Sequence, residues 1–140
     1  MKTIEITNTE KIMFPKSGIT KGDLVYYYEM IAAYMLPYLK DRPLTLHRFP
    51  DGIGKNGFFQ KNASKHIPNW IRTEKIKKEG GWVNHIICDC TETLVYLAGE
   101  GTITFHVTLS TIDKLDYPDK LIFDLDPPNG AFGKVIESAQ

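Results

Sequence analysis

The alternation of hydrophobic and polar residues along the 140-residue chain predicts a single α+β domain with a mostly antiparallel sheet and a few flanking helices. Leucine, tyrosine and isoleucine side chains recur at helical spacing after Thr20 until Pro37, with Thr20 as the N-cap and Asp23 three residues later. A second helix is expected over residues 91–98, and a third is expected to begin within residues 131–140. The predicted strands are residues 2–6, 44–49, 57–61, 71–76, 82–88, 102–109 and 121–126.

A loop rich in Gly, Asp and Asn joins two of these strands over residues 50–56, which is typical of a turn between antiparallel strands. Phe58 and Phe59 follow the loop and point to opposite faces of their strand, so one ring can pack in the core while the other stacks on a nucleic-acid base. Arg48 and Lys61 add positive charge to the same hairpin. A hairpin with both rings packed is the alternative.

Two carboxylates, Asp124 and Asp126, stand two residues apart in the apolar segment 121–127. In a strand they would project from one face, opposite Phe123 and Leu125. Like charges held that close need a shared proton or a divalent metal, and hard oxygen ligands favour Mg²⁺ or Mn²⁺. An edge strand whose acids face water is the alternative, and the motif alone does not decide between them.

Asn8, Lys11 and Lys21 flank the turn into the first predicted helix. A terminal phosphate could meet a helix N-terminus and two ammonium groups there. His106 shares the polar face of the predicted strand 102–109 with threonines, so its imidazole is available to a phosphate or a ribose. Both groups are also common surface features, so neither identifies a site by itself.

The chain is long enough for one domain with a modest core. It contains no stretch near the ~18 apolar residues that span a membrane and no secretory start, so a cytoplasmic protein without membrane contact is expected. The cysteines, Cys88 and Cys90, lie on one face of a predicted strand. Buried free thiols are favoured over a zinc site, which would also need His85 and the distant His106.

The net charge of zero hides an asymmetry between the two parts of the chain. Residues 1–80 contain 14 Lys and Arg against 8 Asp and Glu, a balance of +6, and residues 81–140 contain 3 against 9, a balance of −6. A basic part followed by an acidic part suits a protein that holds a polyanion with one and metal cations with the other. Solvated faces that cancel overall are the alternative.

Six segments of the chain carry a combined signal, and they are residues 8–15, 18–24, 42–46, 48–52, 57–62 and 121–127. In this order they resemble the polymerase domain of bacterial and archaeal DNA ligase D, a family of the archaeo-eukaryotic primase superfamily. The resemblance implies a primase-like, template-dependent nucleotidyltransferase of non-homologous end joining, which uses nucleoside triphosphates and Mn²⁺ or Mg²⁺ at DNA double-strand-break ends. Ku and the ligase and nuclease domains of a longer parent protein are further implied partners, and the implied location is the nucleoid.

The resemblance also assigns roles to individual residues. It makes Asp124 and Asp126 the catalytic, metal-binding acids and His106 a contact to the incoming nucleotide. We expect the two acids to share a sheet face with His106, because the polar faces of the two predicted strands must point the same way if they form one site. The positions that match DNA-binding groups of the family are Asn8, Lys11 and Lys21 for the 5′-phosphate, and Phe58, Phe59, Arg48 and Lys61 by the template.

The family domain is about twice as long, and residues 1–140 match its N-terminal half. The second half of the family domain supplies a third metal-binding aspartate and the groups that hold the triphosphate. We therefore expect an incomplete two-metal site and no synthesis by this chain alone, and Val107-Thr108 replaces the Pro-Trp that commonly follows the family histidine. A non-catalytic module that binds DNA 5′-phosphates is the alternative function, whereas a metal-dependent nuclease or phosphatase is disfavoured by the missing third acid.

Overall fold

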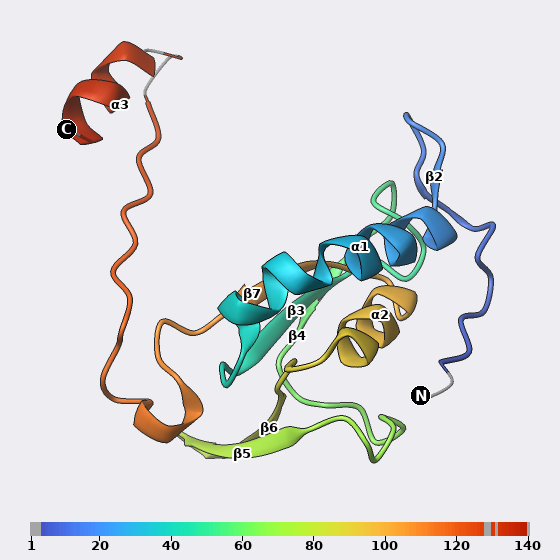
Figure 1. Cartoon of the computed structure of the whole chain (residues 1–140), viewed down its shortest axis with the longest axis horizontal. Helices are drawn as coiled ribbons and strands as arrows, with labels where there is room; N and C mark the ends of the chain where they lie inside the picture. Colours follow the sequence, from blue (N-terminus) through green and yellow to red (C-terminus); the bar gives the residue numbers. More distant parts are fainter. Residues whose placement is uncertain (1–3, 128–129, 131, 140) are drawn as a thin grey trace.

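The computed structural model describes residues 4–127, 130 and 132–139, and it shows a mixed α/β fold with antiparallel strands (Figure 1). Its helices are α1 (Lys21–Leu39), α2 (Thr91–Gly99) and α3 (Phe132–Ala139), with a 3₁₀ turn, η1 (Ile112–Lys114). Its strands are β1 (Ile12–Phe14), β2 (Ile19–Thr20), β3 (Leu44–Arg48), β4 (Phe58–Gln60), β5 (Thr73–Lys78), β6 (Gly81–Ile86) and β7 (Thr102–Val107). The strands pair as β1-β2, β4-β3-β7 and β5-β6.

Helix α1 begins where the sequence predicts it. The Thr20 side chain accepts a hydrogen bond from the Asp23 N–H at 3.2 Å, and the Asp23 carboxylate accepts one from the Thr20 N–H at 2.9 Å. These bonds form the expected capping box, and the bond that the carboxylate accepts from the Thr20 N–H is the largest cause that lowers the pKa of Asp23. Pro37 does not end the helix, which continues to Leu39.

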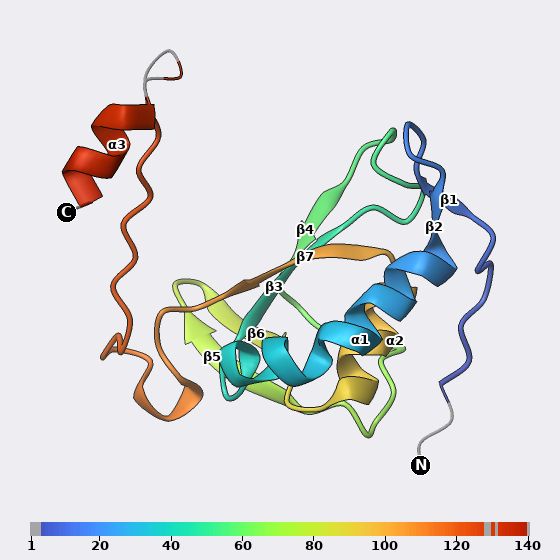
Figure 2. The same cartoon turned by 45° about the horizontal axis from the view of Figure 1, so that its top comes forward.

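The core lies between the sheet β4-β3-β7 and the two helices α1 and α2, which pack against each other (Figures 1 and 2). Leu46 of β3 pairs with Phe105 of β7, and both side chains point toward the helices. Tyr28 of α1 packs edge-on against Phe105 with 4.9 Å between ring centroids, and its hydroxyl donates to the Ile103 carbonyl. Leu94 of α2 is fully buried. The helices α1 and α2 therefore cover one face of the sheet. The other face carries the polar residues that alternate with the core residues along β3 and β7.

The hairpin β5-β6 follows the predicted antiparallel order, with strands shifted by up to two residues from the predicted ranges. Both cysteines are free thiols, and burial raises the pKa of Cys88 to about 12. His85, considered as a zinc ligand, places its Nδ1 2.9 Å from the Leu44 carbonyl oxygen.

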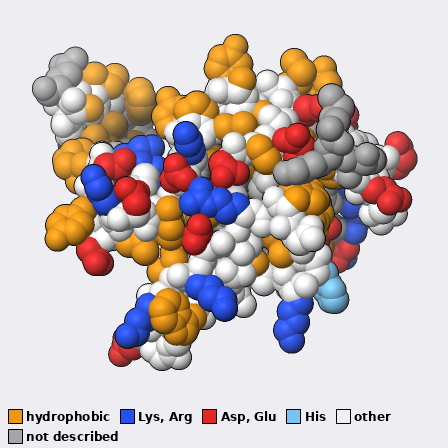
Figure 3. Space-filling view, turned by 60° about the horizontal axis from the view of Figure 1, so that its bottom comes forward, with side chains coloured by type: hydrophobic (Ala, Val, Ile, Leu, Met, Phe, Trp, Pro, Cys, Tyr) orange, Lys and Arg blue, Asp and Glu red, His pale blue; other side chains and the backbone are white. Residues whose placement is uncertain are grey.

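Ion pairs connect the hairpin to the rest of the fold. The Arg72 guanidinium pairs with Asp41 at 2.6 Å, Glu74 at 3.2 Å and Asp89 at 3.4 Å. These hydrogen bonds raise the pKa of Arg72, with the bond to Asp41 as the largest cause. In the space-filling view, basic and acidic side chains lie next to one another on this side of the molecule (Figure 3).

Two strand predictions are wrong. Residues 4–8 have no regular secondary structure, while positions 2 and 3 of the predicted strand 2–6 lie outside the described residues. The predicted strand 121–126 is an extended segment without a strand partner among the described residues, and it leads away from the sheet (Figure 1). A strand needs a neighbour for its backbone hydrogen bonds, so an alternating pattern alone does not produce one.

The predicted third helix is confirmed as α3. Positions 128 and 129 of the predicted turn before it lie outside the described residues. Within the described part of the chain, none of the helices has the length and apolar character required to traverse a bilayer.

Candidate nucleic-acid interface

The segment before β1 folds against the start of α1 and brings Asn8, Lys11 and Lys21 together. The Lys21 N–H donates to the Lys11 carbonyl and the Gly22 N–H to the Thr9 carbonyl, each at 2.8 Å. Asn8 adopts a left-handed backbone, φ 55°, and its carbonyl accepts from the Lys11 N–H at 3.0 Å. We call Asn8, Lys11 and Lys21 the end cluster.

These hydrogen bonds correct one part of the sequence interpretation. The first three N–H groups of α1 already have partners, because Lys21 and Gly22 donate to the preceding segment and Asp23 donates to the Thr20 side chain. A phosphate at the end cluster would therefore be held mainly by the ammonium groups rather than by the free N–H groups of a helix N-terminus.

The end cluster concentrates positive charge at a poorly solvated position. The Lys21 side chain is buried, and its Nζ donates to the Thr7 carbonyl at 2.9 Å. Burial lowers the pKa of Lys21, the charge of Lys11 lowers it further, and Glu100 partly opposes both. An anion between the two ammonium groups would offset their mutual repulsion.

Lys11 already pairs with a carboxylate. Its Nζ lies 2.6 Å from the Asp51 Oδ1, and this hydrogen bond holds the pKa of Asp51 below its ordinary value. Both side chains are partly exposed, and exposed ion pairs contribute little to stability. Lys11 can therefore leave Asp51 for a phosphate at small energetic cost.

The uncovered face of the sheet carries a second group of candidate residues. The register pairs Thr45 with His106, and His47 with both Phe59 and Thr104, so these five side chains share the face that points away from the helices. Phe59 is 62% exposed, and its ring centroid lies 5.6 Å from that of His106. The structure thus brings together the predicted template platform and the predicted nucleotide contact.

Phe58 lies on the opposite face of β4, as the alternation predicts, and it is half exposed rather than part of the core. The Arg48 guanidinium lies 5.5 Å from its ring centroid. Lys61 follows β4 and is exposed.

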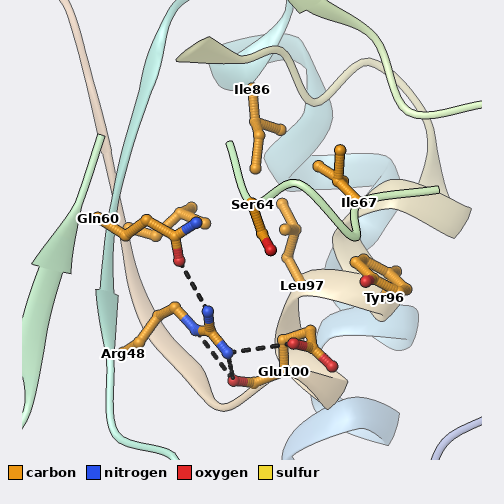
Figure 4. A pocket seen from close by; sticks show the side chains of 9 residues that line it. Arg48, Gln60, Ser64, Ile67, Ile86, Tyr96, Leu97 and Glu100 are labelled. Atoms are coloured by element: carbon orange, nitrogen blue, oxygen red, sulfur yellow. Dashed lines mark hydrogen bonds and ion pairs between the residues drawn. The ribbon is translucent and has the colours of Figure 1, made fainter. Parts of the chain in front are cut away.

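Arg48 forms a clamp inside the protein (Figure 4). Its guanidinium donates to the Gln60 side-chain oxygen at 2.7 Å and to the Glu100 carbonyl at 2.7 and 3.1 Å, and it pairs with the Glu100 carboxylate at 3.1 Å. In this structure the N–H donors of the Arg48 guanidinium bond to residues of the protein and link β3 and β4 to the end of α2. The predicted DNA contact of Arg48 therefore stays a prediction.

Asp124 and Asp126 are exposed in the extended segment after η1. This segment does not join the sheet that carries His106, so the prediction that the acids share a strand face with His106 is wrong here (Figure 2). The described residues contain no group of three or more His, Cys, Asp or Glu that could hold a metal ion.

Sequence reasoning missed His47 and Phe49. His47 stacks on Phe59 with 4.1 Å between ring centroids and 18° between planes, and it contacts Phe49 at 4.4 Å. The signal was present in the alternation, because His47 and Phe49 stand two residues apart around the end of a predicted strand.

The comparisons with known proteins agree with one another. The family model described as "LigD, primase-polymerase domain" matches residues 20–140. The bifunctional non-homologous end joining protein LigD of Bacillus subtilis is 35% identical over 126 residues, which cover 90% of this chain and 20% of that protein. The multifunctional non-homologous end joining protein LigD of Pseudomonas aeruginosa is 30% identical over 139 residues, which cover 98% of this chain and 16% of that protein.

A solved structure is also similar. The polymerase domain from Mycobacterium tuberculosis ligase D in complex with DNA has a TM-score of 0.76 at 28% sequence identity, and the match covers 78% of this chain and 38% of that chain. The chain therefore spans about a fifth of the length of the curated relatives it matches, which is 20% for the Bacillus subtilis protein.

Proposed function

Because the chain belongs to the LigD primase-polymerase domain family, we propose that it takes part in template-dependent nucleotidyl transfer during non-homologous end joining. Its own contribution is to recognise the DNA end: the end cluster binds the 5′-phosphate, and the uncovered sheet face binds the template. The substrates would be nucleoside triphosphates and break ends, with His106 as a nucleotide contact. Ku and the ligase and nuclease activities of longer relatives would be partners.

The observation that carries this proposal is the arrangement of the end cluster. Lys11 and Lys21 come from different parts of the chain, yet the backbone bond from the Lys21 N–H to the Lys11 carbonyl holds them together. Lys21 is buried beside a second ammonium group, which favours an anion of charge about −2 over a singly charged internal phosphate. Charge-assisted hydrogen bonds of this kind are short and strong.

Binding of DNA is supported by similarity as well. The Mycobacterium tuberculosis polymerase domain of similar fold was solved in complex with DNA. In this chain, Phe59 offers an exposed ring beside His106, and aromatic rings of that kind stack on unpaired bases.

The metal site fits only in part. Asp124 and Asp126 supply the hard oxygen donors that Mn²⁺ or Mg²⁺ prefers, and these two residues would hold the ion. Among the described residues no third His, Cys, Asp or Glu joins them to form a metal-binding group, and two exposed carboxylates would bind a metal weakly.

The test of end recognition is a binding titration with recessed duplexes that differ only in a 5′-phosphate or a 5′-hydroxyl. Salt must be fixed, because all phosphate contacts weaken as salt increases. We expect about tenfold tighter binding of the 5′-phosphate duplex, since one additional charge-assisted bond contributes roughly 1.5–3 kcal/mol before ordering costs.

The double variant Lys11→Ala and Lys21→Ala should remove the difference between the two duplexes. A matched control, Lys114→Ala with Lys134→Ala, removes the same charge from other segments and should retain the preference. Equal affinity of the unchanged protein for both ends, with its fold intact by circular dichroism, would overturn the proposal.

A further inference from the structure

Three aromatic rings form a ladder on the uncovered sheet face. His47 is the middle ring, 4.1 Å from Phe59 in a nearly parallel stack and 4.4 Å from Phe49 in a tilted contact. Phe59 is the outer ring and is 62% exposed, whereas His47 and Phe49 are half-buried. We call Phe49, His47 and Phe59 the ring ladder.

The backbone fixes the inner part of this ladder. His47 lies in the central strand β3, paired with Phe59 on one side and Thr104 on the other. Phe49 is seated against Gly57, where a Cβ atom would come within 2.5 Å of the Phe49 ring. The absence of a side chain at Gly57 therefore makes room for the ring that supports His47.

The outer ring lacks such support from its own strand. β4 contains three residues, Phe58–Gln60, and β3 is its only partner strand among the described residues. The rings in contact with Phe59 are His47 and, at 5.6 Å, His106. Of these two contacts, the one with His47 is closer and nearly parallel, with 4.1 Å and 18° against 5.6 Å and 56° for His106.

We propose that His47 is a positioning residue that holds Phe59 in the plane required for stacking on an unpaired template base. This inference rests on the proposed function, because it assumes that Phe59 is the template platform. His47 covers one side of the Phe59 ring and leaves the ring largely exposed, so His47 acts through Phe59 and differs from His106, the proposed nucleotide contact.

The experiment uses a recessed duplex whose first unpaired template base is 2-aminopurine, because stacking on an aromatic ring quenches its fluorescence. Binding of the unchanged protein should quench the signal. His47→Val keeps a residue suited to a strand but removes the stacked ring, and it should reduce the quenching and weaken binding about two- to tenfold. Thr73→Val is the matched control, because it places a valine in β5, outside the uncovered sheet face, and it should behave as the unchanged protein.

Two further variants separate positioning from a general loss of structure. His47→Phe restores a stacked ring and should recover quenching and affinity to within about twofold. Because His47 acts through Phe59, the double variant His47→Val with Phe59→Ala should bind no more weakly than Phe59→Ala alone.

Each outcome is decisive. The inference would be overturned by full quenching with His47→Val or by no recovery with His47→Phe. It would also be overturned if the loss of affinity in the double variant equalled the product of the losses in the two single variants. None of these results would contradict the proposal that Phe59 stacks on the template. If Phe59→Ala binds and quenches like the unchanged protein, the template platform of the proposed function is wrong and the inference fails with it.

Discussion

Arg42 is 4% exposed, and its guanidinium donates to the Asp119 carboxylate at 2.6 Å and to the Thr108 carbonyl at 3.2 Å. Arg42 thereby links Thr108, at the end of β7, to the segment that leads toward Asp124 and Asp126. Arg42 holds the pKa of Asp119 below its ordinary value, mainly through their hydrogen bond. A carboxyl of this kind stabilises the fold above its unfolded pKa of about 4, and this contribution is lost as pH falls through the lower folded pKa.

Asp119→Asn should lower the free energy of unfolding at pH 7, because the buried Arg42 loses its charged partner. The difference from the unchanged protein should narrow as pH falls below about 4, where the carboxylate of the unchanged protein becomes protonated. Urea unfolding at pH 7 and at pH 3 measures both effects, and Asp116→Asn, an exposed carboxylate nearby, is the control. A difference of the same size at both pH values would argue against this role of the ion pair.

At the scale of elements, the packing of α1, α2 and the sheet explains most of the order in the fold. Leu94 of α2 is fully buried in the core that these elements share. Leu94→Ala should reduce the free energy of unfolding by about 2–5 kcal/mol, because a cavity remains where the side chain was. Val95→Ala, one residue along the helix and half-buried, should cost less in the same urea titration. Equal losses for the two variants would show that the core lies elsewhere.

The elements that the sequence predicted correctly carry their own local signals. Thr20 and Asp23 form a capping box within four residues, and a Gly-rich loop specifies the hairpin of β3 and β4. The segment 121–126 has an equally clear alternation, but the regular strand it predicts requires a partner from elsewhere in a chain. Periodicity records which side chains share a face, and it does not record whether a neighbouring strand is present.

The same limit applies to the candidate site at the scale of the whole molecule. The alternation in the sequence predicted that Phe59 and His106 lie on strand faces that a ligand can reach. The register of β3 with β4 and β7 brings these two side chains together. The sequence did not reveal His47, because a stack between two strands depends on their register. It also placed Asp124 and Asp126 beside His106, which would require an added strand in the sheet.

We predict that the 140-residue chain alone does not extend a primer, even with Mn²⁺. The segment that carries Asp124 and Asp126 leads away from the sheet that carries His106 (Figure 1). Among the described residues, no third His, Cys, Asp or Glu completes a metal-binding group with them. Positioning contributes much of the rate of phosphoryl transfer, so a dispersed site should be inactive. A denaturing gel of extension products tests this, with a DNA polymerase of known activity on the same primed template as the positive control. Nucleotide addition by the chain alone would contradict the prediction.

The most direct test of DNA-end recognition by this chain asks where a 5′-phosphate binds. Amide and lysine-ammonium NMR spectra of the protein would be recorded with two recessed duplexes that differ only in a 5′-phosphate or a 5′-hydroxyl. We predict that the differences between the two spectra concentrate at residues 8–11 and 20–22, including the Nζ groups of Lys11 and Lys21, because these residues form or adjoin the end cluster. Identical spectra with the two bound duplexes, or differences confined to other parts of the chain, would contradict this prediction.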